Sequence, residues 1–448
     1  MMVAVFLWMD NRWSIAGAHN VQNATRAPTL RVPGETISTT MARGTMSVSE
    51  EITSSGVGVA VPVRHFHHLD PETHGRLFLR PPQALGPDED RAVLAVALGA
   101  TLYVPATRPD LAETILRRSG DGVCSMVLDL EDAVADHHVE AALLNAVDAL
   151  DRIALLGGAR MQLFVRVRAA EDIRRISSLL TTGAQVLSGF VIPKFGSATG
   201  GAFLDELAAA SGRLGKRLYA MPVLESSEVV HRETRDEELA KIAALLDEHR
   251  ARILAVRIGA TDMCGAFGIR RDRDLTIYDV RVVADAIAAI VNFLGRADDT
   301  GHVITGPVWE YFADHERMFR PTLRATPFEE HDEVRFRQQL VSRDMDGLLR
   351  EITLDRANGI QGKTVIHPTH VAAVHALSAV THEEYHDALD ILGGESVGGV
   401  QASGYRNKMN EMRPHRSWAE RTLVRAKVFG VTNEGVAFVD LLTALAIR

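Results

Sequence analysis

The sequence predicts a closed barrel of eight parallel strands, each followed by a helix. Short apolar runs alternate with amphipathic stretches from about residue 89 to about residue 380. Eight such units follow one another over roughly 280 residues, which is more than an open doubly wound sheet usually holds. No glycine-rich dinucleotide-binding motif follows the first expected strand. A (β/α)₈ barrel is therefore favoured over a Rossmann-like sheet.

The first half of the expected barrel alternates strand and helix without interruption. Its strands are short, mainly apolar runs, as expected for parallel strands that are buried on both faces. Its helices have apolar residues at a spacing of three and four. In chain order the elements are strand 101–106, helix 110–119, strand 124–131, helix 137–156, strand 162–168, helix 171–180, strand 188–194 and a helix around 203–210.

The second half supplies four more apolar runs with longer segments between them. The runs at 218–225 and 253–262 are the most regular, and each ends on a single carboxylate. The four expected strands are 218–225, 253–262, 302–308 and 362–367.

The segments before and after the expected barrel lack its alternation of strands and helices. Residues 1–88 are expected to form an N-terminal extension that is partly disordered, because 20–58 is rich in Thr, Ser, Ala and Gly without a sustained apolar period. The apolar start of the chain lacks the basic region of a signal peptide. The catalytic barrel is expected at 89–378, and a C-terminal helical segment at 379–448.

The composition indicates which kinds of binding partner the protein has. The 448 residues are 46% hydrophobic and 24% charged, with a formal net charge of −9 and with Lys and Arg spread along the chain. Such a distribution gives no basic cluster of the kind that binds nucleic acid. The apolar runs are shorter than the roughly 20 residues that a membrane-spanning helix needs. Cys124 and Cys264 alone make neither a zinc site nor a disulfide framework. We expect a cytoplasmic protein with a small-molecule partner.

Charged residues close several of the expected strands. In a (β/α)₈ barrel, groups at the C-terminal ends of strands converge on one mouth, where catalysis takes place. The candidates at these ends are Asp129, Glu131, Asp132, Arg166, Arg168, Lys194, Glu225, Asp262 and His367. Two acids that end their strands in the same way, Glu225 and Asp262, predict a site for a hard divalent cation. The alternative is that both are ordinary ion-pair partners at the rim.

Several of these candidates have two interpretations. Arg166 either binds substrate or forms a salt bridge with Asp129 or Glu131. Lys194 is either a Schiff-base amine or a member of an ion pair. His367 either takes part in chemistry or orients a neighbour and caps the next helix. The histidines at 65, 67, 68 and 74 are read as a solvated loop, with metal binding as the alternative.

Seven segments resemble, in order and spacing, the HpcH/HpaI aldolase and citrate lyase β-subunit superfamily. The resemblance covers about residues 95–430 and is to the citrate lyase β-like branch, which includes malyl-CoA lyases. The segments are LYVPATRP at 102–109, VLDLEDAV at 127–134, FVRV at 164–167, GFVIPK at 189–194, MPVLE at 221–225, GATD at 259–262 and GIQGKTVIHP at 359–368.

The resemblance implies a Mg²⁺-dependent carbon–carbon lyase, or its reverse, that acts on a carboxylic or acyl-CoA substrate through a metal-stabilised enolate. In such enzymes the acids matching Glu225 and Asp262 hold the metal, and the arginine matching Arg166 stabilises the developing charge. Asp129 and Glu131 match an acidic strand end that positions these groups. The residues predicted to contact the substrate are Arg108, Arg166, Arg168, Lys194 and Pro222. Arg108 matches a second arginine of the family, whereas Arg168 replaces a frequent Asn and adds positive charge at the mouth.

The C-terminal tail carries a related expectation. Family members deliver a catalytic aspartate from a tail that crosses to the neighbouring subunit, and Glu411 stands where that aspartate would be. The resemblance thus implies a homo-oligomer, a trimer or a hexamer, with a helix at 418–426 after the tail. The alternative is a surface helix with a solvated Glu411, because a longer side chain displaces the carboxylate.

The chain also departs from the family. Gly99 and Ala100 replace an Arg-Ser pair, and the segment 263–350 is longer than usual and carries Arg270, Arg271 and Arg273. With Arg168, these arginines predict a substrate richer in negative charge, such as a phosphorylated or polycarboxylated acid. Alternatively they pair with the acids at 272, 274 and 279. A metal- and ligand-binding accessory barrel without turnover, and a thioesterase or phosphoenolpyruvate-type enzyme, remain alternative functions.

Overall fold

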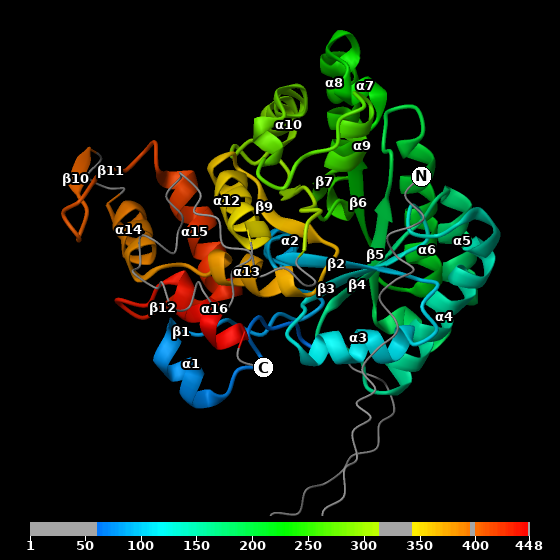
Figure 1. The fold of residues 1–448 in the computed structure, drawn as a ribbon, viewed down its shortest axis with the longest axis horizontal. Coiled ribbons are helices and arrows are strands. Elements are labelled where there is room, and N and C mark those ends of the chain that lie inside the picture. The colour runs from blue at the N-terminus through cyan, green and yellow to red at the C-terminus, as the bar shows by residue number, and fades with distance from the viewer. Residues whose placement is uncertain (1–60, 313–342, 395–398, 447–448) are drawn as a thin grey trace, which may run out of the picture. The chain divides into compact units, whose positions relative to one another are not determined.

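Eight parallel strands close into a barrel at the centre of the computed structural model, which describes residues 61–312, 343–394 and 399–446 (Figure 1). Neighbouring strands in the barrel are also neighbours in the sequence, and the last pairs with the first, so the predicted (β/α)₈ architecture is confirmed. The barrel strands are β2 (Ala100–Pro105), β3 (Ser125–Asp129), β4 (Gln162–Arg166), β5 (Leu187–Ile192), β6 (Tyr219–Leu224), β7 (Val256–Ile258), β8 (Ile304–Gly306) and β9 (Gln361–Val365).

The register brings the charged strand ends to one side. Asp129 at the end of β3 is paired with Arg166 at the end of β4, and Ile192 of β5 is paired with Pro222 of β6. Because all eight strands run in the same direction, their C-terminal ends form a single mouth. The register of β3 and β4 therefore places Asp129 beside Arg166 at this mouth.

One expected strand is much shorter than predicted. The apolar run at 253–262 forms a strand only at Val256–Ile258, and α9 (Ala260–Gly265) begins directly after Gly259. The backbone N–H of Gly259 still donates to the carbonyl of Leu224, 3.1 Å away. Asp262 therefore lies in the first turn of a helix and not on the strand end.

Helices surround the barrel between successive strands. Each packs an apolar face on the outside of the strands, as the amphipathic stretches predicted. The helices that follow the barrel strands are α3 (Leu111–Gly120), α4 (Val139–Leu155), α5 (Ala170–Leu179), α6 (Gly200–Leu214), α7 (Ser227–Val230), α8 (Arg232–Glu248), α10 (Arg281–Leu294), α12 (Arg343–Ala357) and α13 (Thr369–Ser378). No helix in the described ranges is both long enough and apolar enough to cross a bilayer.

The inside of the barrel is filled by side chains and closed at its N-terminal end. Leu94 of α2 (Arg91–Val96) and Leu98 pack in one buried cluster with Val127, Phe164 and Met221 from three barrel strands. The barrel is thus a packed core and not a pore, which leaves the opposite end as the place for a catalytic site.

The described part of the expected N-terminal extension belongs to the packed structure. Residues 61–88 contain α1 (Pro71–Leu77) and β1 (Phe78–Arg80), with Leu77, Phe78 and Leu85 in the core. β1 pairs antiparallel with β12 (Val431–Thr432), from the other end of the chain. The expectation of disorder for residues 1–60 falls outside the described residues.

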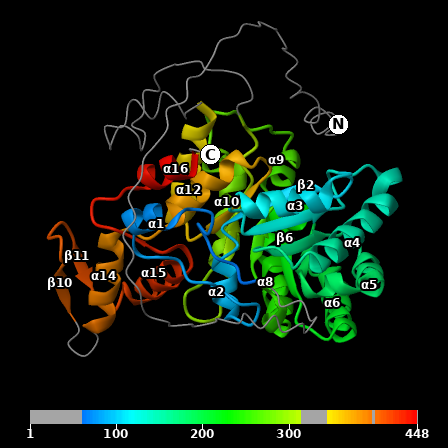
Figure 2. The same cartoon turned by 90° about the horizontal axis from the view of Figure 1, so that it is seen from below.

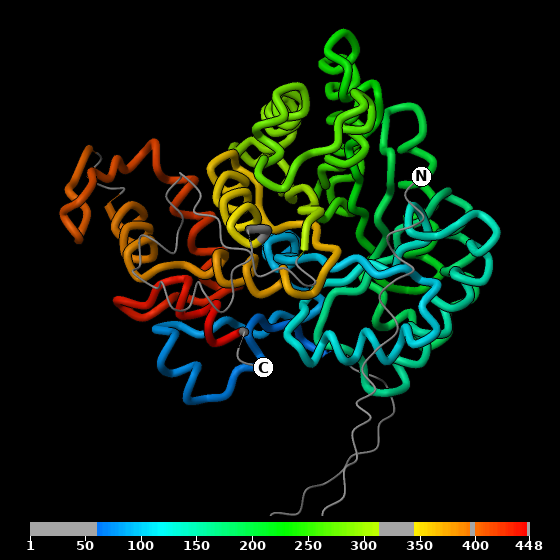
Figure 3. Tube along the Cα trace, viewed as in Figure 1, coloured from blue at the N-terminus to red at the C-terminus, as the bar shows by residue number. Residues whose placement is uncertain are grey.

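The C-terminal segment is helical, as predicted. Its elements are α14 (His382–Gly393), the hairpin of β10 (Val400–Ala402) and β11 (Met409–Glu411), α15 (Arg416–Phe429) and α16 (Phe438–Ala446). In Figures 1 and 2 the hairpin lies at the edge of the molecule, beyond α14 and α15 as seen from the barrel. The tube in Figure 3 traces the same path from α13 to the hairpin and back to α15.

The histidines before α1 are structural and not a solvated loop. His65 is fully buried, and its Nε2 lies 2.9 Å from the carbonyl of Ala97. Its ring packs edge-on against that of His375, with centroids 4.6 Å apart. Gly99, at φ +50°, makes room for both, because a Cβ there would come within 3.0–3.1 Å of the two rings. The expectation of a solvated surface is wrong for His65, since the tertiary fold covers it.

We predict a loss of stability at mildly acidic pH that depends on His65. Burial lowers the pKa of His65 to about 4 and that of His375 well below its usual value. In the unfolded chain both titrate near ~6.5, so the unfolded state takes up protons first as the pH falls. Stability is fully present above about pH 6.5 and is lost progressively toward about pH 4, by about 2 kcal/mol per histidine between pH 7 and 5.

Thermal unfolding measured from pH 7 to pH 5 checks this. A His65→Gln variant should show a flatter dependence of Tm on pH than the wild type, whereas the exposed His137→Gln control should keep the wild-type slope. Equal slopes in all three proteins would show that the buried pair is not the source.

Candidate active site

Glu225 is a buried carboxylate at the mouth of the barrel. It follows β6 directly, and its side chain is 7% exposed. Its Oε1 accepts a hydrogen bond of 2.9 Å from the backbone N–H of Lys194, which follows β5. A Cβ at Gly259 would lie only 1.8 Å from Oε2 of Glu225. Only glycine at position 259, directly after β7, therefore leaves room for this carboxylate.

Asp262 acts on Glu225 through its charge. Burial raises the pKa of Glu225 to about 8, and the negative charge of Asp262 adds to that rise, ahead of a smaller contribution from Glu131. An effect of this kind requires the two carboxylates to lie near each other. The structure thus brings together the two acids that the sequence singled out.

The two carboxylates fit a hard divalent cation. Mg²⁺ in proteins is commonly held by one or two carboxylates, with water or substrate oxygens completing its octahedron. Glu225 is buried and Asp262 is half-buried, and the repulsion between their charges is what such a cation would offset. Within the described ranges no group of three or more His, Cys, Asp or Glu side chains is placed to hold a metal. The chain would therefore supply two ligands and leave the other positions open.

Arg166 is clamped by carboxylates. Its Nε lies 2.5 Å from Oδ1 of Asp129, and its second terminal nitrogen lies 2.6 Å from Oδ2, which is a bidentate pair. Its other terminal nitrogen lies 3.0 Å from Glu131 and 3.1 Å from Asp132. Burial by itself lowers the pKa of Arg166, but the Asp129 carboxylate outweighs it and the pKa rises well above its usual value. The structure shows the salt bridge, and contact of Arg166 with a substrate stays a prediction.

Asp129 also organises the loop that follows β3. Its Oδ1 accepts a 3.0 Å hydrogen bond from the backbone N–H of Glu131, and its Oδ2 accepts one of 3.4 Å from Ala133. Asp129 is 2% exposed. The predicted role of the acidic strand end as a positioning group agrees with these contacts.

Lys194 links two of the acids. Its side chain forms an ion pair with Glu131, while its backbone N–H holds Glu225. Burial lowers the pKa of Lys194, but the bond to Glu131 outweighs it, so the pKa is raised and the side chain is an ammonium. This favours the ion pair over a Schiff-base amine. The backbone at Lys194 has φ +47°, in the left-handed region that residues other than glycine rarely adopt.

The other residues predicted to contact substrate are engaged within the chain. Arg168 donates to the carbonyls of Leu130 (2.7 Å) and Glu131 (3.0 Å) and pairs with Asp136. It therefore braces the loop after β3. Arg108 pairs with Asp110 at 3.1 Å. Pro222 lies inside β6. Contacts of these residues with a substrate stay predictions.

Arg271 is buried away from solvent, against the expectation that it faces the substrate. It is 3% exposed, pairs with Glu351, and donates to the carbonyl of Val308 at 2.8 Å. Its partner Glu351 also bonds Lys363, at 2.9 Å. The expectation that Arg271 contacts the substrate is wrong, because its guanidinium is paired inside a buried ion network with Glu351 and Lys363. Arg273 lies over the ring of Tyr311, 5.8 Å from its centroid.

His367 contacts the start of a helix. Its Nδ1 lies 2.7 Å from Oγ1 of Thr369, the first residue of α13, and its ring stacks on Phe312 with centroids 4.5 Å apart. The N-cap residue of α13 is Pro368, and within the described residues the helix has no side-chain cap, so His367 orients a neighbouring side chain and does not cap the helix.

Glu411 is not brought to this mouth by its own chain. It ends β11, is exposed, and pairs with Val400 of β10. The hairpin is separated from the barrel by α14 and α15 (Figure 1). Glu411 can therefore complete a barrel mouth only if that mouth belongs to another subunit.

Two residues at the mouth were missed by the sequence analysis. Tyr103 of β2 lies between two guanidinium groups, with that of Arg166 5.4 Å and that of Arg257 5.5 Å from its ring centroid. Arg257, on β7, is 1% exposed and contacts Oγ1 of Thr101 at 3.4 Å and the hydroxyl of Thr364. The sequence offered one sign of Arg257, which is the only charged residue inside the apolar run that forms β7.

Comparison with known proteins gives the family. A family model described as C-C bond lyase of the TIM-barrel fold matches residues 92–431. No curated protein sequence matches the chain.

The chain is also similar to solved structures, one of which has a TM-score above 0.5. A citrate lyase from Burkholderia xenovorans LB400 is 17% identical, with a TM-score of 0.52, over 78% of this chain and 96% of that one. CitE from Mycobacterium tuberculosis, in complex with magnesium, acetoacetate and coenzyme A, is 20% identical, with a TM-score of 0.47, over 74% of this chain and 99% of that one. Malate synthase from Haloferax volcanii is 14% identical, with a TM-score of 0.44, over 61% and 72%.

The family match spans the whole barrel and continues to β12, and the closed eight-stranded architecture agrees with it. The chain belongs to the carbon–carbon bond lyase family of the TIM-barrel fold, and its enzymatic class is that of a carbon–carbon lyase.

Proposed function

We propose that the chain is a Mg²⁺-dependent lyase that breaks or forms a carbon–carbon bond of a small carboxylate or of its CoA thioester, with an enolate as the product fragment. The observation that carries the proposal is the buried Glu225, whose carboxylate occupies a space that only glycine at 259 leaves free and whose pKa is raised by burial and by the charge of Asp262. Two such carboxylates without a cation of their own are costly, and a divalent ion would offset that cost.

Glu225 and Asp262 would hold the cation. When bound, Mg²⁺ would act as a Lewis acid toward the carboxylate and the neighbouring oxygen of the substrate. The backbone N–H of Lys194 fixes Oε1 of Glu225, so this ligand is oriented before any ion arrives. Preorganisation of this kind lowers the cost of assembling the site during the reaction.

Arg166 would stabilise the negative charge that develops on the substrate oxygen. The guanidinium is held on three carboxylates, so its position is fixed and its charge is permanent. Fixed positive charge beside a developing oxyanion is worth several kcal/mol of barrier in a site with little water. Asp129 and Lys194 serve this arrangement as positioning residues.

Glu411 would supply a carboxylate to the mouth of a neighbouring subunit. The hairpin that carries it is exposed and lies away from its own barrel, which is what a segment that reaches across a subunit boundary requires. The proposal therefore includes a homo-oligomer with active sites shared between subunits.

The first prediction concerns the metal. Glu225→Gln and Asp262→Asn should each weaken Mg²⁺ binding at least about tenfold, since each removes one of two charged ligands. Isothermal titration with MgCl₂ measures this, and Glu228→Gln, an exposed acid three positions away, is the matched control.

The same variants test the reaction. Wild-type protein incubated with a panel of 3-hydroxyacyl-CoA thioesters and free 3-hydroxy acids should release a keto or aldehyde product only with Mg²⁺ present. Wild-type affinity for Mg²⁺ in both Glu225→Gln and Asp262→Asn would refute the metal site. Tight Mg²⁺ binding without turnover of any of these substrates would instead favour an accessory barrel.

A further prediction concerns Glu411. Oligomers of Glu411→Ala alone and of Arg166→Ala alone should both be inactive, but the two chains expressed together should regain part of the activity. Recovery is expected because mixed oligomers contain mouths with an intact Arg166 facing an intact Glu411 tail. The control is the double variant expressed with the inactive Glu225→Gln chain, which in a ring of head-to-tail contacts restores no mouth. Full activity of Glu411→Ala would contradict the catalytic role of the tail.

A further inference from the structure

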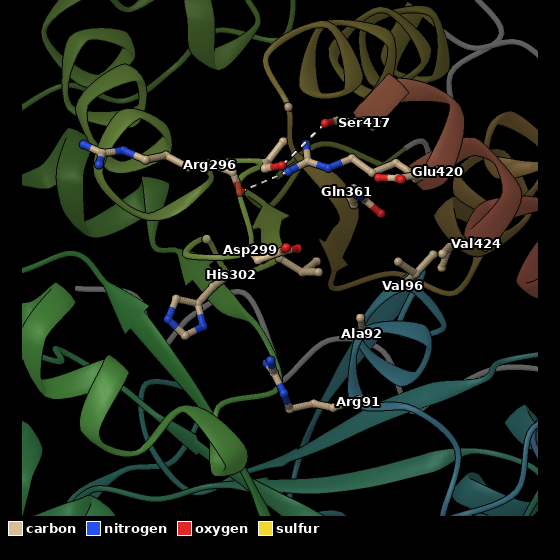
Figure 4. A pocket seen from close by; sticks show the side chains of 15 residues that line it. Arg91, Ala92, Val96, Arg296, Asp299, His302, Gln361, Ser417, Glu420 and Val424 are labelled. Atoms are coloured by element: carbon tan, nitrogen blue, oxygen red, sulfur yellow. Dashed lines mark hydrogen bonds between the residues drawn. The ribbon is translucent and has the colours of Figure 1, made fainter. Parts of the chain in front are cut away.

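A second pocket lies at the end of the barrel opposite to the mouth. It is formed by α2, by the segment between α10 and β8, by the start of β9 and by α15, and its volume is about 220 Å³ (Figure 4). Sites for drug-sized ligands usually measure roughly 300–1,000 Å³, so this pocket suits a smaller molecule. None of the residues assigned to the lyase reaction lines it.

Two buried polar side chains of this pocket are unsatisfied. His302 is 6% exposed, and within the described chain neither of its ring nitrogens has a hydrogen-bond partner. The nearest carboxylate oxygen, Oδ1 of Asp247, is 3.9 Å from Nε2 and so beyond hydrogen-bond distance. The side-chain oxygen of Gln361 is buried and likewise lacks a donor among the described residues. A buried polar group without a partner costs roughly 1–3 kcal/mol, so two in one pocket indicate that something binds there.

The state of His302 limits what it can bind. Burial, together with the charges of Arg250 and Arg91, lowers the pKa of His302 to about 4. At neutral pH the ring is therefore uncharged and offers one N–H donor and one acceptor. Gln361 offers an acceptor oxygen. A ligand that satisfies both must carry acceptors and at least one donor.

Three arginines line the pocket, Arg91, Arg296 and Arg421. The guanidinium of Arg91 donates to the carbonyl of Ile253 at 2.7 Å and forms no ion pair with an acid in the part of the chain that is described. In Figure 4 the Arg91 side chain extends toward His302. Arg296 donates to the carbonyl of Asn292 at 2.9 Å. Two acids also line the pocket: Glu420 pairs with Arg416 at 2.9 Å, and Asp299 adds a negative charge. Arg421 uses its guanidinium on the carbonyls of Gly295 and Arg296.

We propose that this pocket binds a small carboxylic acid that carries a hydroxyl or amino group, at a site separate from the active site. Arg91 takes the carboxylate by a charge-assisted hydrogen bond. The ligand's hydroxyl or amino group donates to the side-chain oxygen of Gln361. His302 donates to one ligand oxygen and accepts from the ligand or from a water molecule. Asp299 disfavours ligands with several negative charges, which favours a monocarboxylate over phosphate.

The test uses glycolate as the probe, with acetate, glycine and inorganic phosphate as comparisons. Binding is measured by isothermal titration on the full-length protein in EDTA, so that no metal-dependent binding at the mouth contributes. We expect glycolate or glycine to bind at millimolar concentration or better, and acetate to bind at least about fivefold more weakly because it has no donor for Gln361.

Variants locate the binding. Arg91→Met and Gln361→Leu should each weaken it about tenfold or more, with two different substitutions guarding against a variant that fails to fold. Glu225→Gln should bind the probe like the wild type, since it alters only the mouth. Three results would overturn the proposal: no binding of glycolate or glycine at about 10 mM, phosphate binding more tightly than both, or binding lost in Glu225→Gln and kept in both pocket variants. None of them bears on the lyase reaction, which is measured separately.

Discussion

A carboxylate that is buried without a paired cation is the constraint around which the mouth of this barrel is built. Glu225 is held by a backbone N–H, fitted against Gly259, and raised in pKa by burial and by Asp262. Replacing it by an apolar residue would remove the electrostatic cost, but glycine would still be needed at 259, because a Cβ there would lie 2.6 Å from the Cβ of residue 225. The chain instead keeps a carboxylate in this buried place. That carboxylate is understandable if a cation, and not a proton, is the usual partner of Glu225 and Asp262.

The distribution of the remaining charges follows from this constraint. Five acids gather at the mouth, and the cations among them are fixed on three: Arg166 on Asp129, Glu131 and Asp132, and Lys194 on Glu131. Glu225 accepts a hydrogen bond from the backbone N–H of Lys194 and lies in the field of Arg166, and the charge of Asp262 helps to raise the pKa of Lys194. Within the described residues neither Glu225 nor Asp262 forms an ion pair, and these are the two acids that suit a metal.

The barrel and the acids at its mouth could be predicted from the sequence, because strands and strand ends are recognisable from local patterns of residues. Short apolar runs, typical of strands buried on both faces, predicted the barrel. The acids at the ends of two of these runs, Glu225 and Asp262, were predicted as metal ligands. Long-range partners could not be predicted in this way. Arg271 lies in a charged stretch that resembles a solvated loop, and only Glu351, 80 positions along the chain, makes it a buried residue. β1 depends similarly on β12, which lies near the other end of the chain.

Arg257 shows how far the influence of the mouth extends into the barrel. Burial lowers the pKa of this arginine, and within the described chain its polar contacts are hydroxyl groups and the sulfur of Met221, with no carboxylate. Of the groups around it, Tyr103 raises the pKa of Arg257, whereas the positive charge of Arg166 at the mouth lowers it further. The ring of Tyr103 lies between the two guanidinium groups, 5.5 Å from that of Arg257 and 5.4 Å from that of Arg166. Tyr103 therefore separates two like charges, one inside the barrel and one at its mouth, and it favours the charge of the inner one.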